Sequence, residues 1–233
     1  MARFGGSAEN TPVVFFHGDV RPGSGRTSKT YLAQTDEKLQ RDADANAKLL
    51  GTPYIFFARP GTYGSSGEHM QRRRPAGARL INVALDKTKR RHGIEKFVLS
   101  RQSGGGHVTS SLLSYRSDVT CAVPTSAGSS PRILQMLKGR TRDSTGYSDA
   151  YEPTEHLTKN RMAPDLRVFV VGNPPDTNVP WQSQTILTTK LREIGVPAET
   201  IQAEGTGSQV HGLSVSSGGI ASWCAQVCQP AKF

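Results

Sequence analysis

Residues 96–107, KFVLSRQSGGGH, contain the pattern on which the expected architecture of the chain rests. An apolar run at 96–100 is followed by a serine, three glycines and a segment at 104–115 that is typical of a helix. This order predicts a strand, a sharp turn and a helix, with Ser103 exposed on the turn. The glycines leave room for the strand and the helix to approach each other closely. Ser103 is therefore a candidate nucleophile.

The same alternation of apolar and amphipathic segments extends along the chain on both sides of this pattern. Short apolar runs alternating with longer amphipathic segments predict a mostly parallel central sheet with helices on both faces. The other expected strands lie at 13–16, 54–58, 119–123, 166–171 and 200–203. The other expected helices lie at 36–50, 76–91, 181–194 and 216–227. Gly51, Gly93 and Gly195 follow three of them, where a left-handed residue commonly ends a helix.

The length of the chain, 233 residues, suits one domain better than two independent cores. We therefore expect a single domain over residues 1–233. The segment 131–164 interrupts the alternation with glycines, prolines and many charges, so we expect it to be an insertion above the sheet.

The formal net charge of +10 indicates attraction to nucleic acid, anionic lipid or acidic substrates. The densest basic runs lie at 72–74 and 87–91, the second at the end of an expected helix, where cations are favourable. We expect both runs to be solvated, with an anion-binding patch as the alternative. No nucleic-acid-binding motif is recognisable, so we expect no nucleic-acid partner.

The apolar runs and the cysteines bear on membrane association, cellular compartment and disulfide formation. No apolar run reaches the roughly 20 residues of a membrane helix, and residues 1–10 lack the apolar core of a secretory signal. We therefore expect no membrane association and a cytoplasmic location. Three cysteines, Cys121, Cys224 and Cys228, are too few and too odd in number for a disulfide framework, so we expect buried thiols.

Reactive side chains follow several of the expected strands, and the carboxyl ends of parallel strands meet at one edge of a sheet. Ser103 follows the strand at 96–100, Asp176 follows the strand at 166–171, and His211 follows the strand at 200–203. A serine needs a base to take its proton and a carboxylate to orient that base. Ser103, Asp176 and His211 are therefore the predicted catalytic triad.

Other residues could in principle take part in this chemistry. Asp165 is the alternative acid, because it also lies close to the strand at 166–171. His107 lies four residues after Ser103 on the expected helix, where packing on the helix face is the more common role. We expect His17 to shape its own loop by hydrogen bonding.

The chain resembles the α/β-hydrolase family over nearly its whole length, and its prolyl-oligopeptidase and dienelactone-hydrolase branches in particular. The matching motifs are His17-Gly18, the turn RPGTYGSSG at 59–67, the turn at Ser103, and the segments 176–180 and 210–213. The resemblance implies that Ser103 is the nucleophile, His211 the general base and Asp176 the acid. It implies an oxyanion hole made by the backbone N–H groups of Gly104 and Asp19. It implies no metal and no organic cofactor.

Two residues near the predicted triad bear on the substrate. Arg101 stands where the family pattern Gly-x-Ser-x-Gly has its first glycine, so its side chain either swings clear or distorts the turn. A positive charge that favours anionic substrates is one interpretation of Arg101, and a solvent-facing or salt-bridged side chain is the other. Tyr63 is a candidate substrate contact, with structural packing as the alternative.

These residues together predict a serine hydrolase that cleaves an ester or amide bond through an acyl-enzyme on Ser103. The substrate is expected to be a small ester or a short peptide, with esterase favoured over peptidase because the chain carries no added propeller domain. The alternative is a non-catalytic binding protein of the same fold, in which Arg101 has altered the turn. The sequence leaves the substrate and the oligomeric state open.

Overall fold

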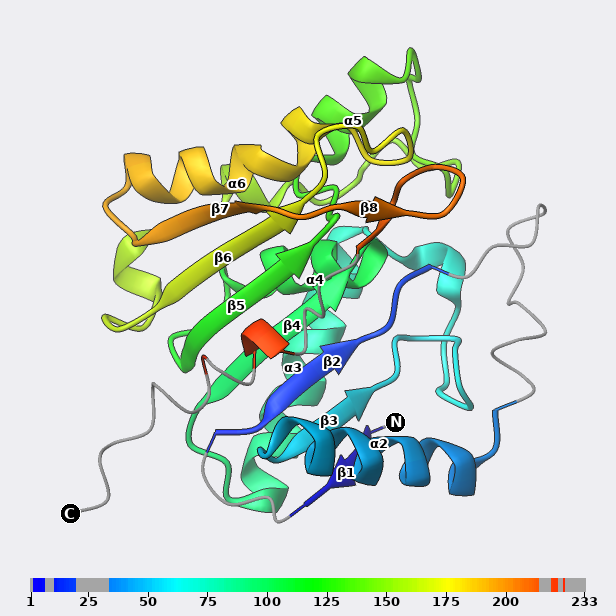
Figure 1. Ribbon diagram of the computed structural model, residues 1–233, viewed down its shortest axis with the longest axis vertical. Helices are drawn as coiled ribbons and strands as arrows, with labels where there is room; N and C mark the ends of the chain where they lie inside the picture. Colours follow the sequence, from blue (N-terminus) through cyan, green and yellow to red (C-terminus); the bar gives the residue numbers. More distant parts are fainter. Residues whose placement is uncertain (1, 7–10, 20–33, 214–218, 222–223, 225–233) are drawn as a thin grey trace.

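The computed structural model describes residues 2–6, 11–19, 34–213, 219–221 and 224. A seven-stranded sheet runs through it in the order β1-β3-β2-β4-β5-β6-β7 (Figure 1). Its strands are β1 (Ala2–Gly5), β2 (Val13–Phe16), β3 (Tyr54–Phe57), β4 (Phe97–Gln102), β5 (Val119–Thr125), β6 (Arg167–Gly172) and β7 (Ala198–Gln202). β1 pairs with β3 in the antiparallel sense, and the other pairs of this sheet are parallel. The predicted mostly parallel sheet is confirmed.

Helices cover both faces of the sheet, as predicted (Figure 1). They are α2 (Asp36–Leu50), α3 (Pro75–His92), α4 (Gly104–Leu112), α5 (Pro131–Leu137) and α6 (Trp181–Glu193). α2 packs on one face, whereas α3, α4 and α6 pack on the other. The expected helix at 216–227 lies largely outside the described residues. In the part of the chain that the structure describes, no helix combines the length and the apolar character needed to cross a membrane.

The sequence signals at the helix ends act as expected. The Thr35 hydroxyl accepts a hydrogen bond from the backbone N–H of Lys38 and so caps the start of α2. Gly51 and Gly93 end α2 and α3 with φ of 62° and 64°, in the left-handed conformation that glycine adopts without a side-chain clash. These caps fix where each connection back to the sheet begins.

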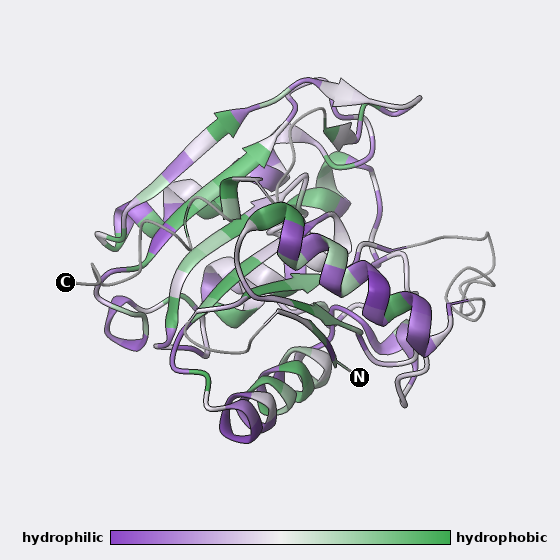
Figure 2. Cartoon of the chain, turned by 60° about the horizontal axis from the view of Figure 1, so that its bottom comes forward, coloured by the Kyte–Doolittle hydropathy of each residue, from purple (hydrophilic) through white to green (hydrophobic). Residues whose placement is uncertain are grey.

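The core follows the alternation of side chains along the central strands. On β2, Val14 and Phe16 join the core beneath α3 and α4, whereas Val13 joins the core on the α2 side. Figure 2 shows hydrophobic colour concentrated on the central strands and hydrophilic colour on the outer sides of the helices. Burial on both faces explains why the strands read as continuous apolar runs in the sequence.

A disulfide joins Cys121 on β5 to Cys224 near the end of the described chain. The expectation of buried thiols is therefore wrong for these two residues, and Cys228 lies outside the described residues. The two cysteines are 103 positions apart, so their pairing is set by the fold and not by a local motif.

The segment 131–164 connects β5 to β6. It contains α5 and two short 3₁₀ helices, Pro153–Glu155 and Lys159–Arg161. Tyr151 holds the segment to the body of the fold, because its hydroxyl is hydrogen bonded to Ser114 at the end of α4 (2.6 Å). A separate two-stranded ribbon, β8 (Gly205–Thr206) with β9 (Gly212–Leu213), follows β7 and carries the loop that ends at His211.

Candidate active site

Ser103 lies on the sharp turn between β4 and α4. Its backbone has φ 57° and ψ −126°, a conformation that costs free energy for a residue with a side chain. The backbone N–H of Ser103 donates to the carbonyl of Thr125 on β5 (2.8 Å) and fixes the turn against the sheet. A Cβ atom on Gly105 would lie 2.1 Å from the carbonyl oxygen of Phe16, so only glycine fits there. The strand, turn and helix predicted around Ser103 are present.

Arg101 leaves this turn intact although it replaces the glycine of the family pattern. Its guanidinium lies over the Phe15 ring, 4.1 Å from the ring centroid, in a cation–π contact. The side chain therefore swings clear of Ser103 instead of distorting the turn, which was one of the two expected outcomes. Arg101 still lines the pocket in front of Ser103.

Asp176 and His211 form a hydrogen-bonded pair at the same edge of the sheet. The Nδ1 atom of His211 donates to Oδ2 of Asp176 (2.7 Å), and the Asp176 side chain is fully buried. Oδ1 of Asp176 accepts from the backbone N–H groups of Asn178 (2.8 Å) and Val179 (2.9 Å), which hold the carboxylate in place. Because Nδ1 carries the proton of the neutral ring, the Nε2 atom of His211 can accept a proton.

Polar side chains at neighbouring strand ends hold the backbone of the His211 loop. Gln102 and Ser126 both donate to the carbonyl of His211, at 2.7 and 3.0 Å. Asn173 donates to the carbonyl of Val210 at 3.0 Å. These three positioning residues were not predicted from the sequence. Each lies two or three residues after the end of a predicted strand, and each ends or directly follows an observed one.

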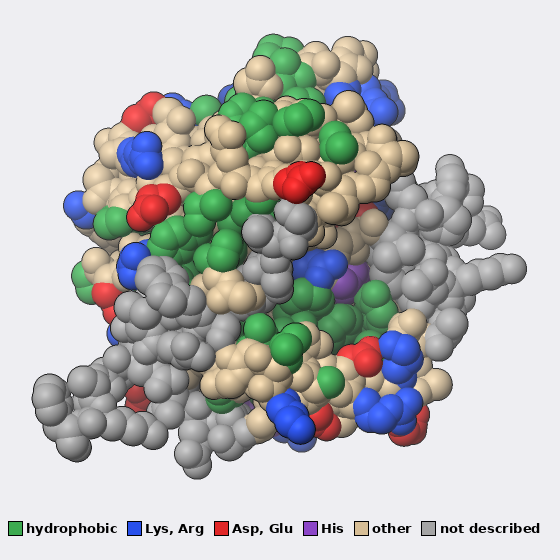
Figure 3. All heavy atoms as spheres, in the orientation of Figure 1, with side chains coloured by type: hydrophobic (Ala, Val, Ile, Leu, Met, Phe, Trp, Pro, Cys, Tyr) green, Lys and Arg blue, Asp and Glu red, His purple; other side chains and the backbone are tan. Residues whose placement is uncertain are grey.

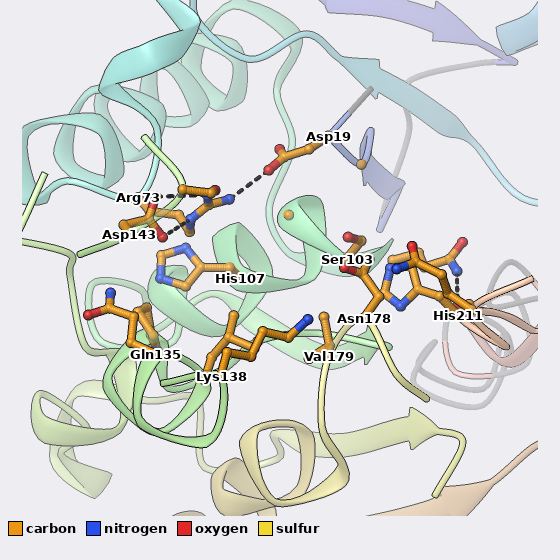
Figure 4. A pocket seen from close by; sticks show the side chains of 18 of the residues that line it. Asp19, Arg73, Ser103, His107, Gln135, Lys138, Asp143, Asn178, Val179 and His211 are labelled. Atoms are coloured by element: carbon orange, nitrogen blue, oxygen red, sulfur yellow. Dashed lines mark hydrogen bonds and ion pairs between the residues drawn. The ribbon is translucent and has the colours of Figure 1, made fainter. Parts of the chain in front are cut away.

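Ser103 and His211 line one pocket of about 580 Å³ (Figure 4). The Nε2 atom of His211 is buried and has no hydrogen-bond partner among the described residues, so Ser103 and His211 are not hydrogen bonded to each other. Hydrogen bonds between catalytic groups are often long without substrate and tighten when it binds. The structure thus brings all three predicted triad residues to one place, with one of the two linking hydrogen bonds formed.

Asp19 has a side-chain environment that the sequence analysis missed. Its carboxylate forms ion pairs with Arg59 (2.5 Å), Arg73 (2.6 Å) and Arg72 (3.1 Å). Burial disfavours the charged form, but these guanidinium groups outweigh it and hold the pKa of Asp19 well below its usual range. Arg73 also binds Asp143 of the insertion (2.9 Å). The expectation that the run at 72–74 is solvated is therefore wrong for Arg72 and Arg73.

The Asp19 loop lies directly against the start of α4. A Cβ atom on Gly104 would lie 2.3 Å from Oδ1 of Asp19, so glycine is needed for this close approach. Gly104 is the first residue of α4, where backbone N–H groups have no acceptor within the helix. The residues of the two predicted oxyanion donors, Gly104 and Asp19, thus lie next to each other and both line the pocket.

Replacing Asp19 with asparagine should destabilise the fold by about 3–5 kcal/mol at pH 7, because it leaves buried guanidinium groups without their shared carboxylate. The lowered pKa of Asp19 means that its stabilisation is present at neutral pH and is lost as the pH falls through that pKa. The difference between Asp19→Asn and wild type should therefore shrink in acid. Urea unfolding at pH 7, and at the lowest pH where the wild type stays folded, measures it.

Asp165→Asn is the matched control for this prediction. Asp165 forms an ion pair with Lys96 (2.9 Å), but both side chains are about half exposed. Loss of such a surface pair changes stability by about 1 kcal/mol or less. Equal destabilisation by Asp19→Asn and Asp165→Asn would show that the buried ion pairs do not support the fold.

Two further histidines near the pocket are neutral and structural. Burial, followed by the charge of Arg59, lowers the pKa of His17 well below its usual value, and its Nδ1 donates to the carbonyl of Gly18 (2.8 Å). Burial lowers the pKa of His107 to about 4, and its Nε2 bonds the carbonyl of Tyr151 (3.0 Å). Both histidines act as the sequence suggested, His17 shaping its loop and His107 packing on α4.

Tyr63 packs against other rings and also faces the pocket, and its contact with a substrate stays a prediction. Its ring packs edge-on against the rings of His17 (4.6 Å between centroids) and Phe56 (5.0 Å). It also lines the same pocket as Ser103.

Within residues 2–6, 11–19, 34–213, 219–221 and 224, no group of three or more His, Cys, Asp and Glu side chains is placed to hold a metal ion.

The insertion supplies one wall of the pocket. Pro131, Leu134 and Gln135 of α5 line it together with Asp19 and His211. Figure 3 shows the molecule hollowed near its middle, where Lys or Arg and His side chains lie beside hydrophobic ones. The site therefore offers a nucleophile candidate and a base candidate in one mixed polar and apolar pocket, with an oriented acid hydrogen bonded to the base candidate.

No protein-family model and no curated protein matches the chain, but many solved structures resemble it. A truncated form of a carbohydrate esterase from gut microbiota has a TM-score of 0.63 and 12% identity, covering 93% of this chain and 85% of that one. An acylaminoacyl peptidase from Pyrococcus horikoshii has a TM-score of 0.57 and 10% identity, covering 95% of this chain and 37% of that one.

A third similar structure is an alpha-beta serine hydrolase homologue from Coxiella burnetii. Its TM-score is 0.53 at 13% identity, and the match covers 98% of this chain and 90% of that one. The identities are too low to carry over an activity, but the shared architecture extends over nearly the whole chain. Together with the parallel sheet, the helices on both faces and the turn at Ser103, these matches show that the chain has the α/β-hydrolase fold.

Proposed function

We propose that the chain is a serine hydrolase that cleaves an ester bond through an acyl-enzyme on Ser103. The observation that carries the proposal is the hydrogen bond from His211 to the buried Asp176 carboxylate, which lies at the same pocket as a serine on a strained turn. A carboxylate that fixes a histidine tautomer beside a strained, pocket-lining serine is what nucleophilic acyl transfer requires. A binding protein has no need of that combination.

In this mechanism His211 Nε2 takes the proton of the Ser103 hydroxyl as the oxygen attacks the ester carbonyl. Asp176 keeps the proton of His211 on Nδ1 and stabilises the imidazolium that forms. The N–H groups of Gly104 and Asp19 donate to the oxyanion of the tetrahedral intermediate. The imidazolium then protonates the leaving alcohol. In the second half, His211 Nε2 takes a proton from water as its oxygen attacks the acyl carbon, and the imidazolium returns a proton to the Ser103 oxygen as the bond to the acid product breaks.

Esterase activity is the favoured form of the proposal, with a small ester as the substrate. The similar carbohydrate esterase has a TM-score of 0.63, higher than the 0.57 of the similar peptidase, which supports an esterase. Cleavage of a short peptide is the second form. The alternative class, a non-catalytic binding protein, would require that the Ser103 hydroxyl is not activated.

A fluorophosphonate probe tests the proposal, because only an activated serine attacks its phosphorus. The native protein should be labelled once, and mass spectrometry of the digest should place the label on Ser103. Ser103→Ala should take no label, whereas Ser66→Ala should be labelled like the wild type, since Ser66 is an exposed turn serine. Absence of label on the native wild type would favour the binding protein.

A further inference from the structure

The charged side chains that line the pocket are unequal in sign. Five are cationic and two are anionic, and the cations come from several different elements. The cations are Arg73, Arg101, Lys138, Arg140 and Arg142, and the anions are Asp19 and Asp143. An excess of one sign in a concave site raises the local potential and attracts ligands of the other sign.

Neither carboxylate of the pocket is available to balance the remaining cations. Arg73 lies between Asp19 (2.6 Å) and Asp143 (2.9 Å) and binds both, as the dashed lines in Figure 4 show. Asp19 carries two more guanidinium partners, Arg59 and Arg72. Three guanidinium groups thus bind the two carboxylates. The carboxylates therefore leave the positive charge of the other pocket cations unbalanced.

Arg140 and Arg142 stand out among the pocket cations. Both are exposed, and within the described part of the chain their side chains form no hydrogen bond or ion pair. The backbone that carries them is nevertheless fixed, because the N–H of Arg140 donates to the carbonyl of Gln135 (2.8 Å) and Asp143 is held by Arg73. Figure 3 shows Lys and Arg side chains gathered beside α5. Two arginines are therefore presented at the pocket on an anchored loop.

Lys138 extends this positive wall toward the predicted triad. Its Nζ donates to the carbonyl of Thr177 (3.1 Å), next to Asp176, so its ammonium group bridges from the end of α5 to the acid loop. Figure 4 shows Lys138 on the side of the pocket that faces Ser103 and Val179. The cations of the insertion thus extend from the mouth of the pocket to the neighbourhood of the nucleophile.

The geometry points to an ester that carries a carboxylate as the substrate of this pocket, with the carboxylate bound by Arg140 and Arg142. This inference rests on the proposed function of Ser103. A guanidinium group matches a carboxylate in shape and can donate two parallel hydrogen bonds to it. The reacting ester carbonyl would lie at Ser103, and the distal carboxylate at the wall made by the insertion. Arg101, whose guanidinium is packed on Phe15, adds to the potential without being the primary contact.

Two esters of equal chain length measure this selectivity: mono-4-nitrophenyl adipate, which carries a carboxylate, and 4-nitrophenyl hexanoate, which does not. The wild type should show a higher kcat/KM for the adipate ester. In Arg140→Gln/Arg142→Gln the ratio of the two kcat/KM values should fall about tenfold, because two charge-assisted contacts are lost. The ratio should also fall as the salt concentration rises.

Lys87→Gln/Arg91→Gln is the matched control, because it removes the same charge from exposed positions on α3 that do not line the pocket. Its ratio should equal that of the wild type. A fall of the ratio in the control as large as that in Arg140→Gln/Arg142→Gln would overturn the inference, since net charge alone would then explain it. An unchanged ratio in Arg140→Gln/Arg142→Gln would overturn it as well.

A binding measurement separates this inference from the proposed reaction. Ser103→Ala protein should bind mono-4-nitrophenyl adipate in calorimetry about tenfold more tightly than Ser103→Ala/Arg140→Gln/Arg142→Gln. If the adipate ester binds in this way but the wild type hydrolyses neither ester, the carboxylate site stands and the hydrolase proposal fails. If the hexanoate ester is hydrolysed but both proteins bind the adipate ester equally, the hydrolase stands and the carboxylate site is wrong.

Discussion

Ser103→Ala should lower the turnover of 4-nitrophenyl hexanoate by roughly 10⁵- to 10⁶-fold, because the side chain that forms the acyl-enzyme is gone. The strained backbone at Ser103 is set by the turn and by the hydrogen bond to Thr125, so alanine should leave the pocket in place. A small rate above the buffer background should persist, since the Gly104 and Asp19 N–H groups can still polarise a bound ester. Steady-state release of nitrophenolate measures the loss.

Ser66→Ala and the circular dichroism spectrum of each variant are the controls for this loss. Ser66 lies in the turn at 59–67 and is exposed, so its replacement should leave the rate unchanged. A Ser103→Ala protein that folds and keeps the wild-type rate would show that the nucleophile is elsewhere.

Asp176→Asn should fold and yet lose roughly 10⁴-fold in kcat, because it inverts the hydrogen bond that orients His211. The backbone N–H groups of Asn178 and Val179 both donate to Oδ1, so they select the carbonyl oxygen of an asparagine for that position. The amide NH₂ then replaces Oδ2 and faces Nδ1 of His211. His211 must accept that hydrogen bond and carry its own proton on Nε2, where it cannot act as a base toward Ser103.

Asp165→Asn is the control variant here too, because Asp165 was the alternative acid from the sequence. Asp165 pairs with Lys96 on the surface, and Asp176 occupies the position next to His211. The rate of Asp165→Asn should match the wild type. An active Asp176→Asn protein together with an inactive Asp165→Asn protein would reverse the assignment of the acid.

The sequence predicts most of the fold because the strands and their ends carry strong local signals. The parallel strands are buried on both faces and read as apolar runs, and left-handed glycines such as Gly51 end the helices. β1 was not predicted, because ARFG is a short strand at the edge of the sheet with an arginine and a glycine among its four residues. The triad candidates were found because catalytic groups in this architecture follow strand ends in a fixed order.

The environment of the site is less accessible to sequence reasoning. Arg72 and Arg73 resemble a solvated basic run in the sequence, and their partner Asp19 is more than fifty positions away. A charge run and a buried ion-pair cluster have the same composition, and only the fold distinguishes them. Gln102 and Ser126 were missed for a related reason, because their partner is a backbone carbonyl, which every residue has.

The bond between Cys121 and Cys224 encloses a covalent ring that contains the insertion, Asp176 and His211 but leaves Ser103 outside. A protease that nicks the exposed loop around Arg140 therefore cuts the ring without dividing the molecule. The two fragments stay linked and migrate together on a denaturing gel until a reductant separates them. The partition of Ser103 and His211 between the two fragments makes the nicked, oxidised protein a two-chain molecule whose predicted triad is shared across the cut.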